Sequence, residues 1–253
     1  MATSDEKAGT TIRVSGPGGA TEVDIYSAEG YRLLADLWLR SAWQHRISYE
    51  PTWLGARIIQ LPEDMVMMQE LLYKVRPDLI VETGVAHGGS AVFYASICEL
   101  LGRGRVLSID VEIRKHNRVA IESHPLSRRI TLIEGSSTSD AVLGEVRTYV
   151  RPGSRVLVVL DSNHSYAHVR DEMARYAPLV SPGSYLVVFD GVMERLTDAP
   201  SGSAAWATDN PATAIREFLG AHEEFEVDPH YNRLGVSYCP SGFLKRAEAP
   251  EAP

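Results

Sequence analysis

Five short apolar runs separated by helix-like patterns constrain the fold of this chain most strongly. Each run is continuous, as a strand requires when both faces of its sheet are covered. Strands that alternate with helices build a parallel, doubly wound sheet. The runs are Leu79–Val81, Val106–Ile109, Ile130–Ile133, Val156–Leu160 and Leu186–Phe189. The sequence therefore predicts an α/β protein with a mostly parallel central sheet.

Helical patterns fill the intervals between these runs. They cover about Ser90–Leu101, Arg114–Ser123, Asp140–Tyr149 and Tyr166–Leu179. After the fifth run the rhythm changes to a long loop rich in Gly, Ser and Ala, followed by a helix at about Pro211–Leu219. Phe225–Val227 and Gly235–Tyr238 are candidate closing strands, which predict an antiparallel C-terminal hairpin.

Two helices are predicted before the first strand, one after Ser27 and one after Pro62, because apolar residues recur there at helical spacing. The stripe of Met65, Met67 and Met68 in the second helix is typical of core filling. We predict that these helices form an N-terminal helical cap on a single domain over residues 25–246. Residues 1–24, rich in Gly, Ser and Thr, and residues 247–253, all Ala, Glu and Pro, are predicted to be flexible.

Charge and cysteine content exclude several classes of protein. The net charge of −8 over 253 residues argues against a general nucleic-acid binder or an anionic-membrane binder. Cys98 and Cys239 lie in apolar surroundings and are predicted to be buried thiols of a reducing cytoplasm. No apolar stretch reaches the length of a membrane span, and no signal peptide is apparent. The sequence predicts a cytoplasmic protein without nucleic-acid or membrane partners.

A glycine-rich turn follows the first apolar run, in the segment Val81–Ser90. Its Gly84-x-x-x-Gly88-Gly89 spacing differs from the G-x-G-x-x-G of dinucleotide sites, and no P-loop lysine follows. Glycines allow the backbone to approach a ligand, and the N-terminus of the next helix offers free N–H groups. The acid Glu82 suits a cationic ligand, and S-adenosylmethionine carries both an ammonium and a sulfonium group. A tight turn without any ligand has the same pattern.

Nearly every predicted strand ends in an acid or a small polar residue. These residues are Glu82, Asp110, Glu134-Gly135-Ser136, Asp161 and Asp190. Ligands of such sheets bind beyond the carboxyl ends of the strands. Asp110 is placed to accept hydrogen bonds from ribose hydroxyls, with a helix N-cap as the alternative, and Glu134 to Ser136 are candidates for an adenine pocket. Capping and turn preferences explain any one of these residues, but five together favour a site.

Asp161-Ser162-Asn163-His164 is the strongest catalytic candidate. His164 is suited to act as a base near neutral pH. Asp161 and Asp190, on neighbouring strands, can converge on one divalent cation such as Mg²⁺. The alternative makes Asp161 an N-cap and His164 an exposed residue of the first helical turn. His168, one turn further on, either joins the site or is exposed.

At these residues the chain resembles a known family. The segments are Trp53-Leu54-Gly55, Gln60-Leu61-Pro62, Val81-Glu82-Thr83-Gly84, Leu160–His164 and Phe189-Asp190. They look like the cephalosporin-hydroxylase-type group, which includes rhamnosyl O-methyltransferases of antibiotic biosynthesis, and the similarity covers about Ser27–Arg246. The resemblance implies a Rossmann-like class I methyltransferase fold, S-adenosylmethionine as cofactor, often Mg²⁺, and a homo-oligomer.

The resemblance also implies roles for single residues. Cofactor binding is carried over to Glu82, Gly84, Ser90, Asp110 and Ser136, to which we add His87 and Asp161. Metal binding is carried over to Asp161 and Asp190, and the catalytic base to His164, with Asp161 beside it. Relatives place an Asp, Glu or Asn next to the second metal carboxylate, but here Phe189 and Gly191 flank Asp190. A third protein ligand is therefore missing or comes from elsewhere.

The reaction expected from the resemblance is direct displacement by a rhamnose hydroxyl on the sulfonium methyl group, with TDP-rhamnose and its 3-hydroxyl favoured. The loop from Gly191 to Asn210 is the expected wall of the sugar pocket, with His164, Trp206 and Asn210 as substrate contacts. Packing of the loop by Trp206 is an equal alternative. Rhamnose already attached to an aglycone is an alternative acceptor. A nicotinamide-dependent oxidoreductase and a non-catalytic cofactor-binding accessory subunit are alternative functions.

Overall fold

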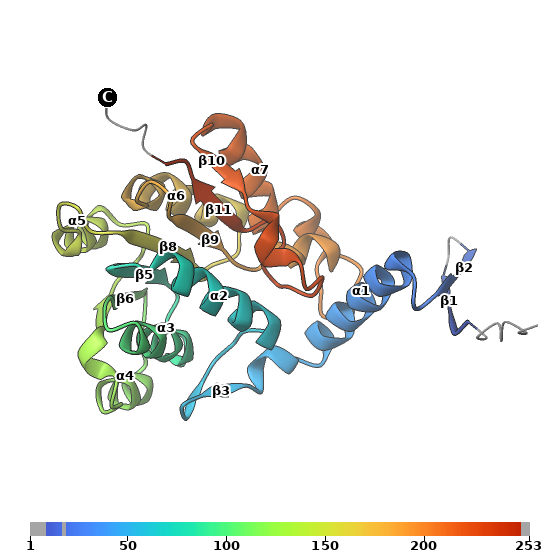
Figure 1. The fold of residues 1–253 in the computed structure, drawn as a ribbon, viewed down its shortest axis with the longest axis horizontal. Helices are drawn as coiled ribbons and strands as arrows, with labels where there is room; N and C mark the ends of the chain where they lie inside the picture. Colours follow the sequence, from blue (N-terminus) through green and yellow to red (C-terminus); the bar gives the residue numbers. More distant parts are fainter. Residues whose placement is uncertain (1–8, 17–18, 249–253) are drawn as a thin grey trace, which may run out of the picture.

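The computed structural model describes residues 9–16 and 19–248, and a seven-stranded sheet lies at its centre (Figure 1). The strands are β5 (Leu79–Thr83), β6 (Arg105–Asp110), β7 (Ile130–Glu134), β8 (Val156–Leu160), β9 (Tyr185–Val188), β10 (Phe225–Val227) and β11 (Phe243–Arg246). Their order is β10-β11-β9-β8-β5-β6-β7. Strands β5 to β9 are parallel, and β11 is antiparallel to both β9 and β10. The predicted mostly parallel sheet with an antiparallel C-terminal hairpin is confirmed.

Helices cover both faces of this sheet. The helices of the described chain are α1 (Ala28–Gln44), α2 (Pro62–Val75), α3 (Gly89–Leu100), α4 (Lys115–Glu122), α5 (Asp140–Tyr149), α6 (Tyr166–Tyr176) and α7 (Pro211–Ala221). Successive strand residues point to opposite faces. Ile80 accordingly packs with α2 and α3, whereas its neighbour Val81 packs with α5, α6 and α7. Each central strand needs a continuous apolar run because helices bury both faces of the sheet. None of the described helices is both long and apolar enough to cross a bilayer.

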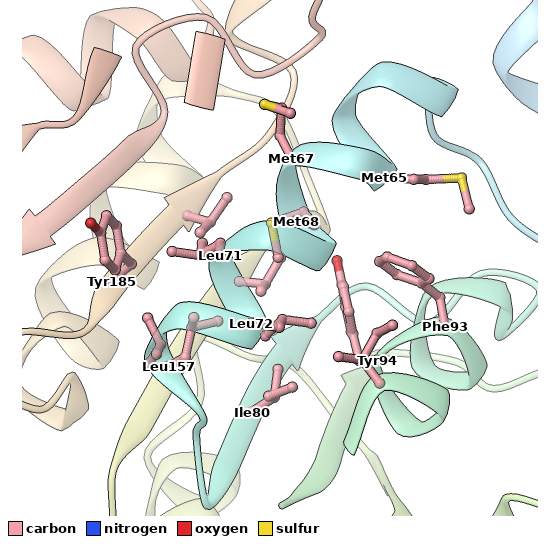
Figure 2. Close-up of a cluster of buried hydrophobic side chains, with 14 of the residues drawn as sticks. Met65, Met67, Met68, Leu71, Leu72, Ile80, Phe93, Tyr94, Leu157 and Tyr185 are labelled. Carbon is pink, nitrogen blue, oxygen red and sulfur yellow. The ribbon is translucent and has the colours of Figure 1, made fainter. Parts of the chain in front are cut away.

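The core under α2 is filled by its methionines and leucines (Figure 2). Met67 and Met68 are 2% and 0% exposed, and Met65 is also buried, so the predicted core role of this stripe is confirmed. Leu71 and Leu72 extend the same packing towards the sheet. Cys98 and Cys239 are buried free thiols, as predicted.

The closing strand was predicted at the wrong place. Residues Gly235–Tyr238 are not a strand in the structure, and the strand next to β9 is β11. Ser237 and the backbone of Tyr238 are bound instead by the side chain of Asp64 on α2. Phe243 and Leu244 are completely buried and pair with β9. Tertiary partners therefore decided which of two short apolar segments entered the sheet.

The described part of segment 1–24, which the sequence analysis predicts to be flexible, contains regular structure. Strands β1 (Thr11–Gly16) and β2 (Gly19–Asp24) pair as an antiparallel hairpin, in register from Thr11 opposite Asp24 to Gly16 opposite Gly19. Alternating Ile12 and Val14 explain this, since β-branched residues favour strands. Residues 1–8 and 17–18 lie outside the described residues. Figure 1 shows the hairpin beyond the start of α1, away from the sheet.

The predicted flexible tail, 247–253, lies mostly outside the described residues. Its first residue is in place, because the Ala247 backbone N–H donates a hydrogen bond to the Glu224 carbonyl oxygen at 2.8 Å. At the other end of the domain, the first predicted helix begins as expected. Ser27 is the N-cap of α1, and its hydroxyl accepts the Gly30 backbone N–H.

Candidate active site

The ends of three central strands lie level, and this assembles the site. Thr83 at the end of β5 is in register with Ile109 of β6 and with Leu160 of β8. The residues that follow these strands therefore emerge at one edge of the sheet. Gly84 donates its backbone N–H to the Ile109 carbonyl, and Asp161 donates its own to the Thr83 carbonyl. The topology explains why polar residues after separate strands converge.

Gly84 occupies a position that only glycine fits. Its φ of 94° lies in the left-handed region, and a Cβ there would overlap the carbonyl oxygen of Asp161. The loop after β5 thus runs directly against the end of β8. Gly89 at the start of α3 is similarly close, because a Cβ would overlap the Arg57 carbonyl. The glycines bring the first turn of α3 up to the cavity that Gly89 and Ser90 help to line.

Asp110 holds the glycine-rich loop in place. Its Oδ2 accepts the backbone N–H groups of Val85 at 2.8 Å and Ala86 at 3.2 Å. Its Oδ1 accepts the N–H of Glu112 at 3.2 Å. The N-cap alternative is not what the structure shows, because the N-cap residue of α4 is Arg114. Asp110 is not among the residues that line the cavity, and its contact with a ribose stays a prediction.

Glu82 is a fully buried carboxyl group behind the loop. Its Oε2 accepts the Ser108 hydroxyl at 2.6 Å, whereas its Oε1 has no hydrogen-bond partner among the described residues. Burial raises the pKa of Glu82 to about 7, and the hydrogen bond from Ser108 opposes this effect. Gln60 is also buried, and its Oε1 is another unpartnered acceptor within the described chain. Unpaired buried acceptors of this kind suit a ligand that carries hydrogen-bond donors or positive charge.

A cavity of about 450 Å³ opens at this edge of the sheet. Seven of the residues predicted for the site line it: Gly84, His87, Ser90, Asp161, His164, Asp190 and Trp206. Four others, Glu82, Asp110, Ser136 and Asn210, do not line it. The structure therefore brings the loop after β5 and the residues after β8 and β9 together in one space.

Asp161, His164 and Asp190 form a cluster of possible metal ligands. One ligand atom of each lies within 4.8 Å of the others, and His164 Nε2 is 3.1 Å from Asp190 Oδ2. Burial raises the pKa of Asp161, with the charges of Asp190 and Glu82 adding to the effect. Carboxylate and imidazole donors in this arrangement suit a divalent cation. The imidazole of His164 lies where a third donor could stand, which the sequence around Asp190 lacks.

The alternative reading of the Asp161–His164 segment is not what the structure shows. The N-cap residue of α6 is Ser165, so Asp161 is no cap and His164 precedes the first helical turn. His168 belongs to a network beside the cavity rather than to the ligand cluster. Its Nε2 lies 3.2 Å from the Ser162 hydroxyl and 3.3 Å from Glu172, which raises the pKa of His168.

The prediction that Asn210 contacts a substrate is wrong. Asn210 is fully buried and is the N-cap of α7, where its Oδ1 accepts the Thr213 N–H at 2.9 Å. Its Nδ2 donates to the carbonyl oxygen of Trp206 at 2.7 Å. The Asn-Pro start of a helix is a capping signal, and it explains this residue better than a binding role. The side chain of Ser136 makes a local contact, since its hydroxyl lies 3.0 Å from that of Thr138.

Three aromatic residues form one wall of the cavity: Trp43, Trp206 and Tyr238. The ring centroids of Trp43 and Trp206 are 5.7 Å apart, and those of Trp43 and Tyr238 are 5.3 Å apart, both edge to face. Trp206 packs against Trp43, as one alternative predicted, and it also lines the cavity, while its contact with a substrate stays a prediction. Trp43 and Tyr238 were missed by the sequence analysis, since no local pattern connects residues so far apart.

The sequence of this chain is similar to that of a known family. A family model described as Rhamnosyl O-methyltransferase/CmcI matches residues 45–247. A rhamnosyl O-methyltransferase of Mycobacterium leprae is 32% identical over 204 residues, which cover 77% of this chain and 82% of that protein.

Solved structures agree with the fold. CmcI-D160 with Mg and S-adenosylmethionine superposes with a TM-score of 0.55 at 20% identity, covering 79% of this chain and 77% of that one. MycE, a methyltransferase of the mycinamycin biosynthetic pathway in complex with Mg and S-adenosylhomocysteine, superposes with a TM-score of 0.50 at 19% identity. The superposition covers 94% of this chain and 67% of that one. At this identity the likeness is one of fold, and it confirms the predicted Rossmann-like class I methyltransferase fold.

Proposed function

The chain belongs to the rhamnosyl O-methyltransferase/CmcI family, and from this we propose that it transfers the methyl group of S-adenosylmethionine to a hydroxyl of rhamnose. TDP-rhamnose is the acceptor that we propose, with its 3-hydroxyl as the nucleophile, in natural-product biosynthesis. The observation that carries the proposal is the Asp161–His164–Asp190 cluster, which shares one cavity with the glycine-rich loop after β5.

The cofactor fits the acidic side of this cavity. S-adenosylmethionine carries an ammonium and a sulfonium group, and the buried Glu82 and Gln60 present unpartnered acceptors next to the loop. The start of α3, where Gly88 is the N-cap and makes no side-chain cap hydrogen bond, leaves backbone N–H groups for the cofactor carboxylate. S-adenosylmethionine in CmcI-D160 and S-adenosylhomocysteine in MycE support the same cofactor here.

A divalent cation also fits the residues present. Asp161 and Asp190 would hold it, and His164 lies beside them and stays free to take a proton. Such an ion orients a hydroxyl and makes it more acidic. Mg in the CmcI and MycE structures supports this assignment.

His164 is the group that we assign to proton removal. The acceptor oxygen bonds to the methyl carbon while the carbon–sulfur bond breaks with its electron pair on sulfur, and the hydroxyl proton passes to the imidazole of His164. Asp190 Oδ2, 3.1 Å from His164 Nε2, holds the ring in place. Holding the two reactants in line supplies much of the remaining acceleration.

We also propose that the protein is a homo-oligomer. Tyr31, Leu34 and Trp38 follow one another at helical spacing on α1, and they are 51%, 38% and 41% exposed in the single chain. An apolar stripe of this kind is typical of a surface that is covered by a partner. Light scattering of the purified protein tests the assembly, and a monomer at micromolar concentration would contradict it.

The central experiment is methyl transfer from methyl-labelled S-adenosylmethionine to TDP-rhamnose in the presence of Mg²⁺. We expect one labelled methyl group on the 3-oxygen, which two-dimensional NMR identifies. Methyl rhamnoside serves as the comparison acceptor. Transfer to the rhamnoside alone would assign the enzyme to glycoside acceptors, and transfer to neither sugar would overturn the proposed function.

A further inference from the structure

The phenol of Tyr238 is a buried polar group in the cavity wall that makes no hydrogen bond within the described chain. Tyr238 is 5% exposed, and its Oη has no hydrogen-bond partner among residues 9–16 and 19–248. Buried hydroxyl groups in folded proteins are normally paired, because an unpaired one costs desolvation free energy. The same residue lines the cavity that contains Asp161, His164 and Asp190. A ligand in that cavity is therefore the missing partner.

The segment that carries Tyr238 is fixed in place by Asp64. The carboxylate of Asp64, in the first turn of α2, accepts the Ser237 hydroxyl at 2.5 Å and the Tyr238 backbone N–H at 2.8 Å. Ser237 Oγ in turn accepts the Cys239 N–H at 2.8 Å. Asp64 is 1% exposed, so this is an interior network and not a surface contact. A carboxylate is costly to bury, and here it serves to hold a loop that is otherwise irregular.

The chemistry of the wall matches a sugar. Tyr238 packs edge to face against Trp43, which packs in the same way against Trp206. Aromatic rings of this kind present apolar surface to C–H groups, and a deoxysugar has such groups beside its hydroxyls. Burial raises the pKa of Tyr238 to about 12, while the neighbouring Ser48 hydroxyl lowers it, so the phenol stays neutral and is able to donate a hydrogen bond.

We propose that Tyr238 donates a hydrogen bond to an oxygen of the acceptor sugar and so orients the ring towards His164, and that Asp64 is the positioning residue that presents Tyr238. The assignment rests on the proposed methyl transfer to a sugar. The sequence analysis gave no role to either residue, because it placed Tyr238 in a strand.

Tyr238→Phe is the first test, with TDP-rhamnose as acceptor and S-adenosylmethionine saturating. We expect the KM for the acceptor to rise about tenfold, the size of one lost hydrogen bond, with the KM for S-adenosylmethionine unchanged. The melting temperature should not fall, because the phenol has no partner to lose among the described residues.

Tyr185→Phe is the matched control. Tyr185 Oη donates to Asp228 Oδ2 at 2.8 Å, and Tyr185 does not line the cavity. Its removal should lower the melting temperature and leave both KM values unchanged. The two tyrosines thus separate a binding role from a structural one.

Asp64→Asn tests the positioning role. We expect the acceptor KM to rise, and the double variant with Tyr238→Phe to be no worse than the more affected single variant, because both act through one phenol. If Asp64→Asn does not fold, Ser237→Ala takes its place as the test, because it removes one of the two hydrogen bonds that Asp64 accepts. An unchanged acceptor KM in Tyr238→Phe, with normal transfer by the wild type, overturns this assignment alone. No transfer by the wild type to TDP-rhamnose or to methyl rhamnoside overturns the proposed function and the assignment with it.

Discussion

His164 Nε2 lies 3.1 Å from Asp190 Oδ2, although the two residues follow different strands of the sheet. The side chain of Asp190 is 17% exposed and that of His164 is 33% exposed, so the pair is partly shielded from water at the cavity wall. A carboxylate in this position fixes the orientation of the imidazole ring that we propose accepts a proton.

Replacing His164 should slow chemistry without weakening cofactor binding. We expect His164→Ala to lower kcat by about 10²- to 10⁴-fold, the usual contribution of a general base. Steady-state kinetics measure the loss, and calorimetric titration with S-adenosylmethionine should give a wild-type Kd. His230→Ala is the control, since His230 is exposed and outside the cavity. Turnover near that of the wild type would remove His164 from the role of base.

Chelation should abolish activity, and Mg²⁺ should restore it, if Asp161 and Asp190 hold the ion. Asp190→Asn should need about tenfold or more Mg²⁺ for half-maximal rate, because it loses a charged ligand. Asp140→Asn, whose side chain is 94% exposed, should titrate like the wild type. Activity that survives exhaustive chelation argues against the cation.

Glu82→Gln should stabilise the ligand-free protein and weaken cofactor binding. Burial raises the pKa of Glu82 to about 7, whereas a carboxyl in the unfolded chain titrates near ~4.5. The folded state thus binds the proton more tightly. Stability from this group is fully present below the unfolded pKa and is lost as pH rises through about 7.

At pH 8 we expect the variant to unfold at a higher temperature, with a gain of at most ~3 kcal/mol. The gain should shrink towards pH 5, where the wild-type carboxyl is mostly protonated in the folded state. Thermal melts at the two pH values measure the difference. A variant that melts earlier at both would show that the carboxylate is better accommodated than its burial indicates.

Gly84→Ala should be far more damaging than Gly153→Ala. Both glycines have positive φ, 94° and 76°, so both variants incur backbone strain of about 1 kcal/mol. Only Gly84 adds a clash, with the carbonyl oxygen of Asp161, while a Cβ at Gly153 meets nothing within 4 Å. Urea denaturation should show a loss of ~3 kcal/mol or more for Gly84→Ala. Equal losses in the two variants would mean that the loop shifts freely.

Asn210→Ala should cost stability and leave substrate binding intact. The loss of an N-cap and of the bond to the Trp206 carbonyl should lower the free energy of unfolding by about 1–2 kcal/mol. The acceptor KM should stay within about twofold of the wild type, because Asn210 does not line the cavity. A large rise in KM at unchanged stability would restore the role in binding that the sequence suggested.

The central strands were predictable from sequence because burial on both faces of the sheet requires a continuous run of apolar residues in each strand. Val156–Leu160 is a continuous apolar run, and the structure has β8 at the same residues. The segment 243–246 carries no such mark, since Lys245 and Arg246 follow only two apolar residues. Its place in the sheet depends on partners in β9 and β10, which no window of sequence contains.

The site divides in the same way. Asp161, His164 and Asp190 were found because residues that end parallel strands meet at one edge, so the topology alone brings them together. Tyr238 and Asp64 were not found. Tyr238 lies in an irregular loop that the side chain of Asp64 holds by hydrogen bonds, and no sequence pattern signals such a contact. Asn210 was misjudged for the opposite reason, since a local capping signal was read as a sign of binding.

The position of β11 has a consequence for how the protein is made. It lies between β9 and β10, so the last strand in sequence fills an interior place in the sheet. While the ribosome is still adding residues 189–242, the edge of β9 beside Asp190 has no permanent neighbour, and β10 has nowhere to dock. Exposed strand edges invite pairing with other chains. Chaperone demand and aggregation should therefore be greatest late in synthesis, when all the ligand residues exist but the sheet beside them is open.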